Sequence, residues 1–369
     1  MDPSVKRTVE ASTVTRGREA RAQEIFNEIS DACKDFFGDA THASTLRWPG
    51  GAMRQPSRTR FMGPNGATQR AQFDSTSPSH ALELVKLTAL MNVTEGRPEI
   101  TIGLIDGPVA VGHPDLASQN IREIGGKQSG TCARARSAAC MHGTFVAGVL
   151  CAKRSSAAPA ICPNCTLLVR PIFAETDSGN AQAPSATPEE LAAAIIDCVE
   201  AGARVMNLSV ALAHPSCNGE ARLDEALNHA ARRGVLVVAA AGNQGAIGSS
   251  AITRHPWIVP VVACDLRGRP TGESNLGGSI ARRGLRAPGD RITSLGTDGE
   301  PHTFGGTSVA APFVTGALAL LCSAFPAARG ADLRMALLRS DRMERTTVVP
   351  PLLQAWTAYH FMAGSHGTR

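Results

Sequence analysis

Short apolar runs alternate with amphipathic segments over most of the chain. Apolar runs bounded by turns are typical of buried strands, whereas apolar residues recurring every three or four positions indicate helices. Strands are expected at 99–105, 166–171, 204–210, 235–241 and 257–264, and helices at 81–92, 140–152, 188–201, 222–233 and 308–325. This alternation of apolar strands and helices predicts an α/β fold with a mostly parallel sheet covered on both faces.

The first eighty residues follow a different pattern. Residues 18–37 repeat apolar positions at helical spacing, whereas 40–79 are rich in Gly, Pro, Ser, Thr and Arg, with no acidic residue between Asp39 and Asp74. This composition favours a solvated linker, with a basic functional patch as the alternative. We therefore expect an N-terminal extension at 1–80, partly helical and then flexible, a globular domain at 81–360 and a tail at 361–369.

Composition adds little to this pattern. The 43% hydrophobic content, 19% charged content and net charge of +5 describe a soluble globular protein and do not favour a nucleic-acid or membrane partner. The N-terminus lacks the apolar segment of a secretory signal, and no stretch reads as the roughly eighteen apolar residues of a membrane span. A cytoplasmic location is the resulting expectation.

Three polar residues stand in contexts that suit acyl-transfer chemistry. Asp106 follows the apolar run Ile100-Thr-Ile-Gly-Leu-Ile, His142 begins His142-Gly-Thr-Phe-Val-Ala-Gly148, and Ser308 lies in Gly305-Gly-Thr-Ser-Val-Ala-Ala-Pro312. An acid, an imidazole and a hydroxyl together can activate a serine nucleophile. Each has an ordinary alternative, namely a turn aspartate, a helix-start histidine and an N-cap serine, but their joint occurrence favours a catalytic site. Pro312 is expected in the first turn of the Ser308 helix, where its missing N–H costs little.

Asn243 completes the set. It ends the apolar run Val237-Val-Ala-Ala-Ala-Gly-Asn243, where a side-chain amide at the end of a strand can donate to a tetrahedral oxyanion. The alternative is a turn asparagine favoured by the neighbouring glycines.

At these residues the chain resembles the subtilases, the subtilisin-like serine peptidases. The His142, Ser308 and Asn243 segments match three family motifs, and Ala287-Pro-Gly289 and 351–358 resemble further family elements. The resemblance covers about residues 81–360 and implies a three-layer α/β fold and endopeptidase activity. It further implies that Ser209, Val210 and Ala211 belong to a strand that lines the substrate-binding cleft. Ala240, Ala241 and Gly242 are expected to form a wall of the P1 pocket, which binds the substrate residue before the cleaved bond.

The sequence departs from the family pattern at two positions. Gly107 and Pro108 follow Asp106 where the family usually has Ser or Thr and then Gly, and Ala211 stands where the family often has Gly. Together with His113-Pro-Asp-Leu116, the Asp106 variant resembles subtilases that process ribosomally made precursor peptides. Transpeptidation or macrocyclisation through the same acyl-enzyme, and a silent peptide-binding module, are the alternatives.

The implied partner is a peptide or protein substrate, with no cofactor expected. Calcium is not supported by a clear acidic motif. Cys132, Cys140, Cys162 and Cys165 could bind zinc as four thiolates, although free or locally paired thiols are the favoured interpretation. Cys140 lies two residues before His142, so a reagent that modifies this thiol could inhibit the enzyme. The favoured alternative is that Cys140 is a buried apolar thiol without such an effect.

Overall fold

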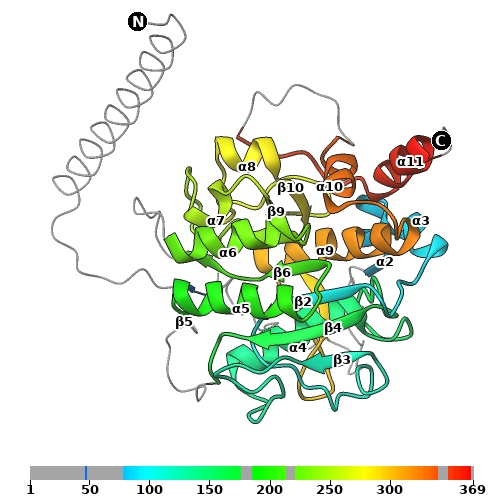
Figure 1. The fold of residues 1–369 in the computed structure, drawn as a ribbon. Helices are drawn as coiled ribbons and strands as arrows, with labels where there is room; N and C mark the ends of the chain where they lie inside the picture. The colour runs from blue at the N-terminus through cyan, green and yellow to red at the C-terminus, as the bar shows by residue number, and fades with distance from the viewer. Residues whose placement is uncertain (1–45, 48–77, 176–184, 213–220, 340–347, 367–369) are drawn as a thin grey trace, which may run out of the picture. The chain divides into compact units, whose positions relative to one another are not determined.

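The computed structural model describes residues 46–47, 78–175, 185–212, 221–339 and 348–366 (Figure 1). The helix predicted at 18–37 and nearly all of the linker predicted at 40–79 lie outside the described residues. The division into an extension, a domain and a tail therefore stays a prediction.

A seven-stranded sheet forms the centre of the described fold, as the apolar runs predict. Its strand order is β10-β9-β8-β6-β2-β4-β3, and every pairing in it is parallel. The five predicted strands are confirmed to within about two residues at either end, whereas the edge strands β3 and β10 were not predicted. The strands are β2 (Thr101–Asp106), β3 (Ile121–Glu123), β4 (Thr166–Pro171), β6 (Val205–Leu208), β8 (Leu236–Ala240), β9 (Ile258–Cys264) and β10 (Leu285–Pro288).

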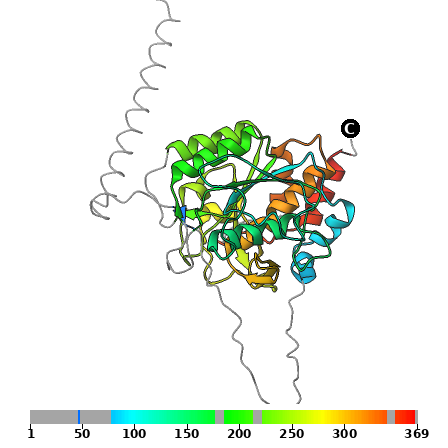
Figure 2. The same ribbon diagram turned by 90° about the horizontal axis from the view of Figure 1, so that it is seen from below.

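Helices cover both faces of this sheet, which confirms the three-layer α/β prediction. On one face, α4 (Ala138–Cys151) and α9 (Thr307–Ala324) contribute to one apolar core. On the other face, α5 (Pro188–Glu200) and α6 (Ala221–Arg232) pack side by side on a second core. Figure 2 shows the green helices α5 and α6 on the opposite side of the sheet from α4. A capping box between Thr187 and Glu190 forms the start of α5.

Shorter elements complete the domain. The single helix predicted at 81–92 is in fact α2 (Pro78–Leu84) and α3 (Leu87–Val93), because Lys86 adopts a left-handed conformation with φ of 58° between them. The remaining described elements are α7 (Ala251–Arg254), α8 (Gly278–Arg283), α10 (Gly330–Leu338), α11 (Ala355–His366) and the hairpin β11 (Ile292–Leu295) with β12 (Pro301–Phe304).

Helix α9 corrects two expectations. By length and composition it could cross a membrane, but 94% of it is buried inside the protein, against β6, β8, β9 and β10. It is therefore a core helix. Pro312 lies in the interior of α9 and not in its first turn, so the helix lacks the N–H that would bond the Ser308 carbonyl oxygen.

A second, smaller sheet has the strand order β5-β1-β7. The central strand β1 (Leu46–Arg47) comes from the predicted linker and pairs antiparallel with β5 (Ser185–Ala186) and with β7 (Ala211–Leu212). Leu46 is registered with Ala186 and Leu212, and Arg47 with Ser185 and Ala211. A segment of the predicted linker thus forms the middle strand between β5 and β7, which are far from it in sequence.

Candidate active site

Asp106 and His142 are brought together by the contact between β2 and α4. Asp106 is the last residue of β2, at the carboxyl end where open α/β sheets place their sites. Helix α4 starts at Ala138, two residues earlier than predicted, because Ser137 caps it by accepting the N–H of Cys140. His142 therefore lies in the second turn, on a helix that is buried along nearly its whole length.

Two glycines allow this close approach. A Cβ on Gly107 would overlap the Ala139 carbonyl oxygen, and a Cβ on Gly143 would overlap the carbonyl oxygens of Gly107 and Pro108. The backbones of β2 and α4 therefore touch at both positions. Ser or Thr, which the family usually has after the aspartate, would not fit at 107 without moving α4.

The three predicted catalytic side chains form one chain of hydrogen-bonding contacts. Nδ1 of His142 lies 2.7 Å from Oδ1 of Asp106, and Nε2 of His142 lies 3.0 Å from Oγ of Ser308. All three residues are buried, at 0%, 2% and 1% exposure for Asp106, His142 and Ser308. A carboxylate on Nδ1 fixes the histidine tautomer that leaves Nε2 free to accept the serine proton.

Ser308 occupies the second position of α9 and is not its N-cap. The N-cap residue is Gly306, which adopts φ of 120° and has no capping side chain. The N-cap alternative for Ser308 is therefore wrong, and its hydroxyl is directed to His142. Its N–H lies in the first turn, where a helix provides no backbone acceptor.

Asn243 lies beside the start of α9. Its Oδ1 accepts the N–H of Thr307, and a Cβ on Gly306 would lie 2.5 Å from its Nδ2. The Thr307 hydroxyl in turn accepts the N–H of Gly242. The Asn243 amide is thus oriented by the turn that carries Ser308, with its donor nitrogen close to that turn.

The sequence interpretation missed the residues that hold this loop. Asn275 accepts the N–H groups of Gln244 and Ala246 through Oδ1 and donates to the Ala241 carbonyl. Thr307 could have been noticed from its place next to Ser308. Asn275 gives no comparable signal, because it lies far along the chain in an irregular segment.

One carboxylate oxygen of Asp106 has an unusual environment. Oδ1 accepts both the Gly107 N–H, at 2.7 Å, and the His142 contact, whereas Oδ2 is buried without a hydrogen-bond partner among the described residues. Position 107, where the family usually has the hydroxyl of Ser or Thr, is a glycine in this chain and offers no side-chain donor. The Asp-Gly-Pro variant therefore leaves half of the carboxylate without a protein donor.

The predicted substrate-lining residues lie at two strand ends. Ser209 and Val210 follow β6 and are buried, and Ala211 is in β7, where its backbone pairs with Arg47. Ala240 ends β8, while Ala241 and Gly242 lead from it to Asn243. Since Ile105 of β2 is registered with Leu208 of β6, the segment after β6 leaves the sheet beside Asp106, and the segment after β8 leaves it one strand further on.

The cysteines do not form the four-thiolate site that was considered. Cys132 and Cys140 form a disulfide, and Cys162 and Cys165 are buried thiols elsewhere in the first core. Free or locally paired thiols were the favoured interpretation, and the Cys132–Cys140 pair shows local pairing. The expectation that Cys140 is a buried apolar thiol is therefore wrong, because its sulfur is bonded to that of Cys132. Cys151 is also buried, and burial raises its pKa to about 12, so this thiol is unreactive near neutral pH.

Comparison with known proteins agrees with this geometry. The model of the "Subtilase family" matches residues 97–353. A thermophilic serine proteinase of Bacillus sp. (strain AK1) is 32% identical over 63% of this chain, which spans 54% of that relative's length.

Two solved structures share the fold. A mutant of the protease domain of PatA, also described as patellamide maturation protease, is 28% identical with a TM-score of 0.67, over 73% of this chain and 97% of that one. The PatG macrocyclase domain is 23% identical with a TM-score of 0.65, over 75% of this chain and 95% of that one. At that identity the second likeness shows the fold alone.

Proposed function

Because the chain belongs to the subtilase family, we propose that it is a serine endopeptidase that processes a ribosomally made precursor peptide. The observation that carries the proposal is the pair of contacts of His142, to Asp106 at 2.7 Å and to Ser308 at 3.0 Å. This arrangement suits acyl transfer, and the likeness to a patellamide maturation protease supports the precursor-peptide substrate. A cytoplasmic location is part of the proposal.

In the proposed reaction Ser308 Oγ attacks the carbonyl carbon of the scissile bond while its proton passes to Nε2 of His142. Asp106 holds the protonated ring through Nδ1. His142 then gives the proton to the leaving amine, which departs and leaves an acyl-enzyme. Water attacks this ester with His142 again as the base, and the acid product leaves with Ser308 restored.

The developing oxyanion needs donors that are in place before the reaction. Nδ2 of Asn243 and the N–H of Ser308 are the proposed pair, one at the end of β8 and the other in the first turn of α9. The positive end of the α9 dipole lies at the same place. Because Thr307 fixes the Asn243 amide through Oδ1, little reorganisation is required when charge develops.

The small sheet supports a proposal for how the substrate backbone is held. An extended peptide can bind by adding a strand between two sheet edges, with main-chain hydrogen bonds providing affinity. Residues 46–47 already occupy such a position between β5 and β7. We infer that the substrate takes this place and that the chain's own segment competes with it.

A proline at position 46 tests this competition. Leu46→Pro removes a backbone N–H from β1 and weakens its pairing. The KM for an extended peptide substrate is expected to fall severalfold with kcat unchanged. An unchanged KM would contradict the competition and leave the proposed chemistry untouched.

Cyclisation is the second candidate outcome of the same acyl-enzyme, if a substrate amine captures it in place of water. Hydrolysis is favoured here because the likeness to the PatA protease domain carries more identity than that to the PatG macrocyclase. Mass spectrometry separates the two outcomes, because a macrocycle lacks the water that a linear product carries. A silent peptide-binding module would give neither product.

The proposal is tested with a fluorophosphonate probe on the folded protein. The wild type should be labelled on Ser308, and Ser308→Ala should not be labelled and should lose about 10⁶-fold in kcat. Ser118→Ala, a change at an exposed serine, is the matched control and should behave like the wild type. Wild-type protein without an adduct on Ser308 would refute a serine peptidase.

A further inference from the structure

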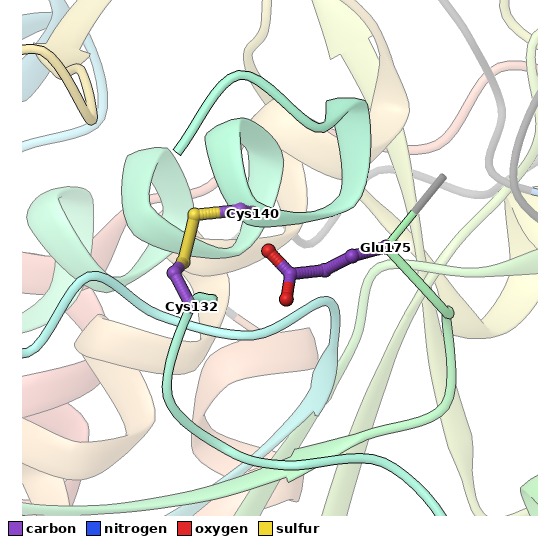
Figure 3. A group of neighbouring side chains, drawn as sticks. All are labelled: Cys132, Cys140 and Glu175. Atoms are coloured by element: carbon purple, nitrogen blue, oxygen red, sulfur yellow. A yellow bond between two sulfur atoms is a disulfide. The ribbon is translucent and has the colours of Figure 1, made fainter. Parts of the chain in front are cut away.

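Three potential metal ligands converge beside the start of α4. The sulfurs of Cys132 and Cys140 and a carboxylate oxygen of Glu175 all lie within 4.8 Å of one another. Figure 3 shows the Glu175 carboxylate directed at the Cys132–Cys140 disulfide, with Cys140 on the helix and the other two residues on adjoining loops. The proposed peptidase reaction uses none of the three.

The carboxylate of Glu175 is held in place by the loop that carries Cys132. Its Oε2 accepts the N–H of Ala133 at 2.9 Å, and its Oε1 accepts the N–H of Arg134 at 2.8 Å and the hydroxyl of Ser137 at 3.2 Å. Hydrogen bonds of this kind orient carboxylates that bind metal ions.

Cys132 also differs from the free thiols in accessibility. Cys132 and Glu175 are half-buried, whereas Cys140 and the six cysteines that the structure describes as free are all buried. Solutes can therefore reach the disulfide from its Cys132 side before they reach the free thiols. Cys140 lies in the first turn of α4, where the positive end of the helix dipole stabilises a thiolate.

We propose that, once the disulfide is reduced, Cys132, Cys140 and Glu175 form a site for a thiophilic divalent cation such as Zn²⁺. A dithiol reductant exchanges its two thiols for the protein disulfide, giving two protein thiols and an oxidised reductant. The cation then displaces the two thiol protons and binds two thiolates and one carboxylate, with water as the fourth ligand. The disulfide and the metal-bound form exclude each other, because both use the same two sulfurs.

A cation bound at this site would link the start of α4, the helix that carries His142, to the neighbouring loops. Cys140 precedes His142 by two residues, and its neighbour Ala139 touches Gly107 beside Asp106. A cation at this place joins the 132–137 loop and the segment after β4 to that helix. The inference does not depend on the proposed peptidase activity, and metal binding is measured without a substrate.

Cobalt is the probe, because thiolate ligands give Co²⁺ a charge-transfer absorption in the near ultraviolet. Full-length protein is reduced with dithiothreitol, freed of the reductant without oxygen and titrated with Co²⁺. We expect a band that saturates at one cobalt per chain and is bleached by an equivalent of Zn²⁺. The same protein with its disulfide intact should give no band.

Variants assign the ligands. Cys132→Ser should weaken Co²⁺ binding at least about tenfold, and Glu175→Gln should keep the thiolate band while weakening binding about tenfold. Cys264→Ala, at a buried thiol, is the control and should bind as the wild type does. The proposal is overturned if the reduced wild type gives no band at stoichiometric cobalt, or if Cys132→Ser, folded by circular dichroism, binds as tightly as the wild type.

Discussion

The two helical faces of the sheet differ in how completely their helices are buried. Helices α4 and α9 are surrounded by protein, with nearly every residue buried. Helices α5 and α6 bury one side and expose the other, where Glu200, Asp224 and Arg232 lie. His142 and Ser308 both come from the buried pair. Close packing on all sides restrains both helices, so the two side chains that are proposed to react keep their positions relative to each other.

This difference predicts that changes at the buried face alter activity, whereas changes at the exposed face alter stability alone. Among changes that keep Asp106, His142 and Ser308 intact, the largest effect is expected at Asn243, between the end of β8 and the start of α9. Asn243→Asp keeps an oxygen for the Thr307 N–H but removes the amide donor. We expect kcat to fall about 10²–10³-fold with little change in KM, measured on a peptide substrate. A loss that appears in KM alone would contradict the assigned role.

The next effect is expected where α4 touches β2. Gly143→Ala forces a Cβ against the carbonyl oxygens of Gly107 and Pro108, so α4 must move and carry His142 with it. We expect kcat/KM to fall about 10²-fold, because a shift of about 1 Å in a reacting group has that effect. Ala193→Leu, a larger addition on the exposed side of α5, is the matched control and should leave kcat/KM unchanged.

High pH should lower the free energy of unfolding through a buried thiol on each face of the sheet. Burial raises the pKa of Cys151 in α4 and of Cys198 in α5 to about 12, from an ordinary value of 9.0. Between these values the unfolded chain releases the thiol proton and the folded chain keeps it, so stability falls as pH rises above about 9. The slope is at most about 1.4 kcal/mol per pH unit for each thiol.

Urea unfolding midpoints from about pH 8 to pH 10.5 check this expectation. Cys198→Ala should show a shallower decline than the wild type. If the decline in the variant is as steep as in the wild type, the Cys198 thiol is not one of the groups responsible.

The smallest effect is expected at the start of α5. Thr187→Ala removes the side chain that accepts the Glu190 N–H and should lower the free energy of unfolding by about 1 kcal/mol, with activity unchanged. Glu189→Ala, in the same turn but outside the capping box, should cost less than half of that. An activity loss in Thr187→Ala would show that the exposed face also controls the site.

The sequence predicted the amphipathic elements better than the buried ones. Both α5 and α6 were located to within one residue, because a one-sided apolar pattern marks both of them. The start of α4 was placed two residues late, since Ala138 and Ala139 carry no signal of their own. The break at Lys86 rests on a left-handed backbone conformation that the apolar pattern of 81–92 does not report, whereas the place of Pro312 follows from the start of α9 at Thr307.

The contact of Asp106, His142 and Ser308 was predictable because each of the three lies in a recognisable segment, at a strand end or a helix start. The contacts that position these three residues were not predictable from the sequence. The need for glycine at 107 and 143 arises from contact between two backbones. The Cys132–Cys140 pairing was one of several open alternatives, and the pairing of residues 46–47 with β5 and β7 depends on partners that are distant in sequence.

The pairing of residues 46–47 also fixes an order of events during synthesis. β1 leaves the ribosome first and must wait for β5 and β7, and closing so long a loop makes this pairing slow. Yet both partners precede Ser308 in the chain. A nascent chain that folds as it emerges can therefore place β1 between β5 and β7 before its proposed nucleophile has been translated.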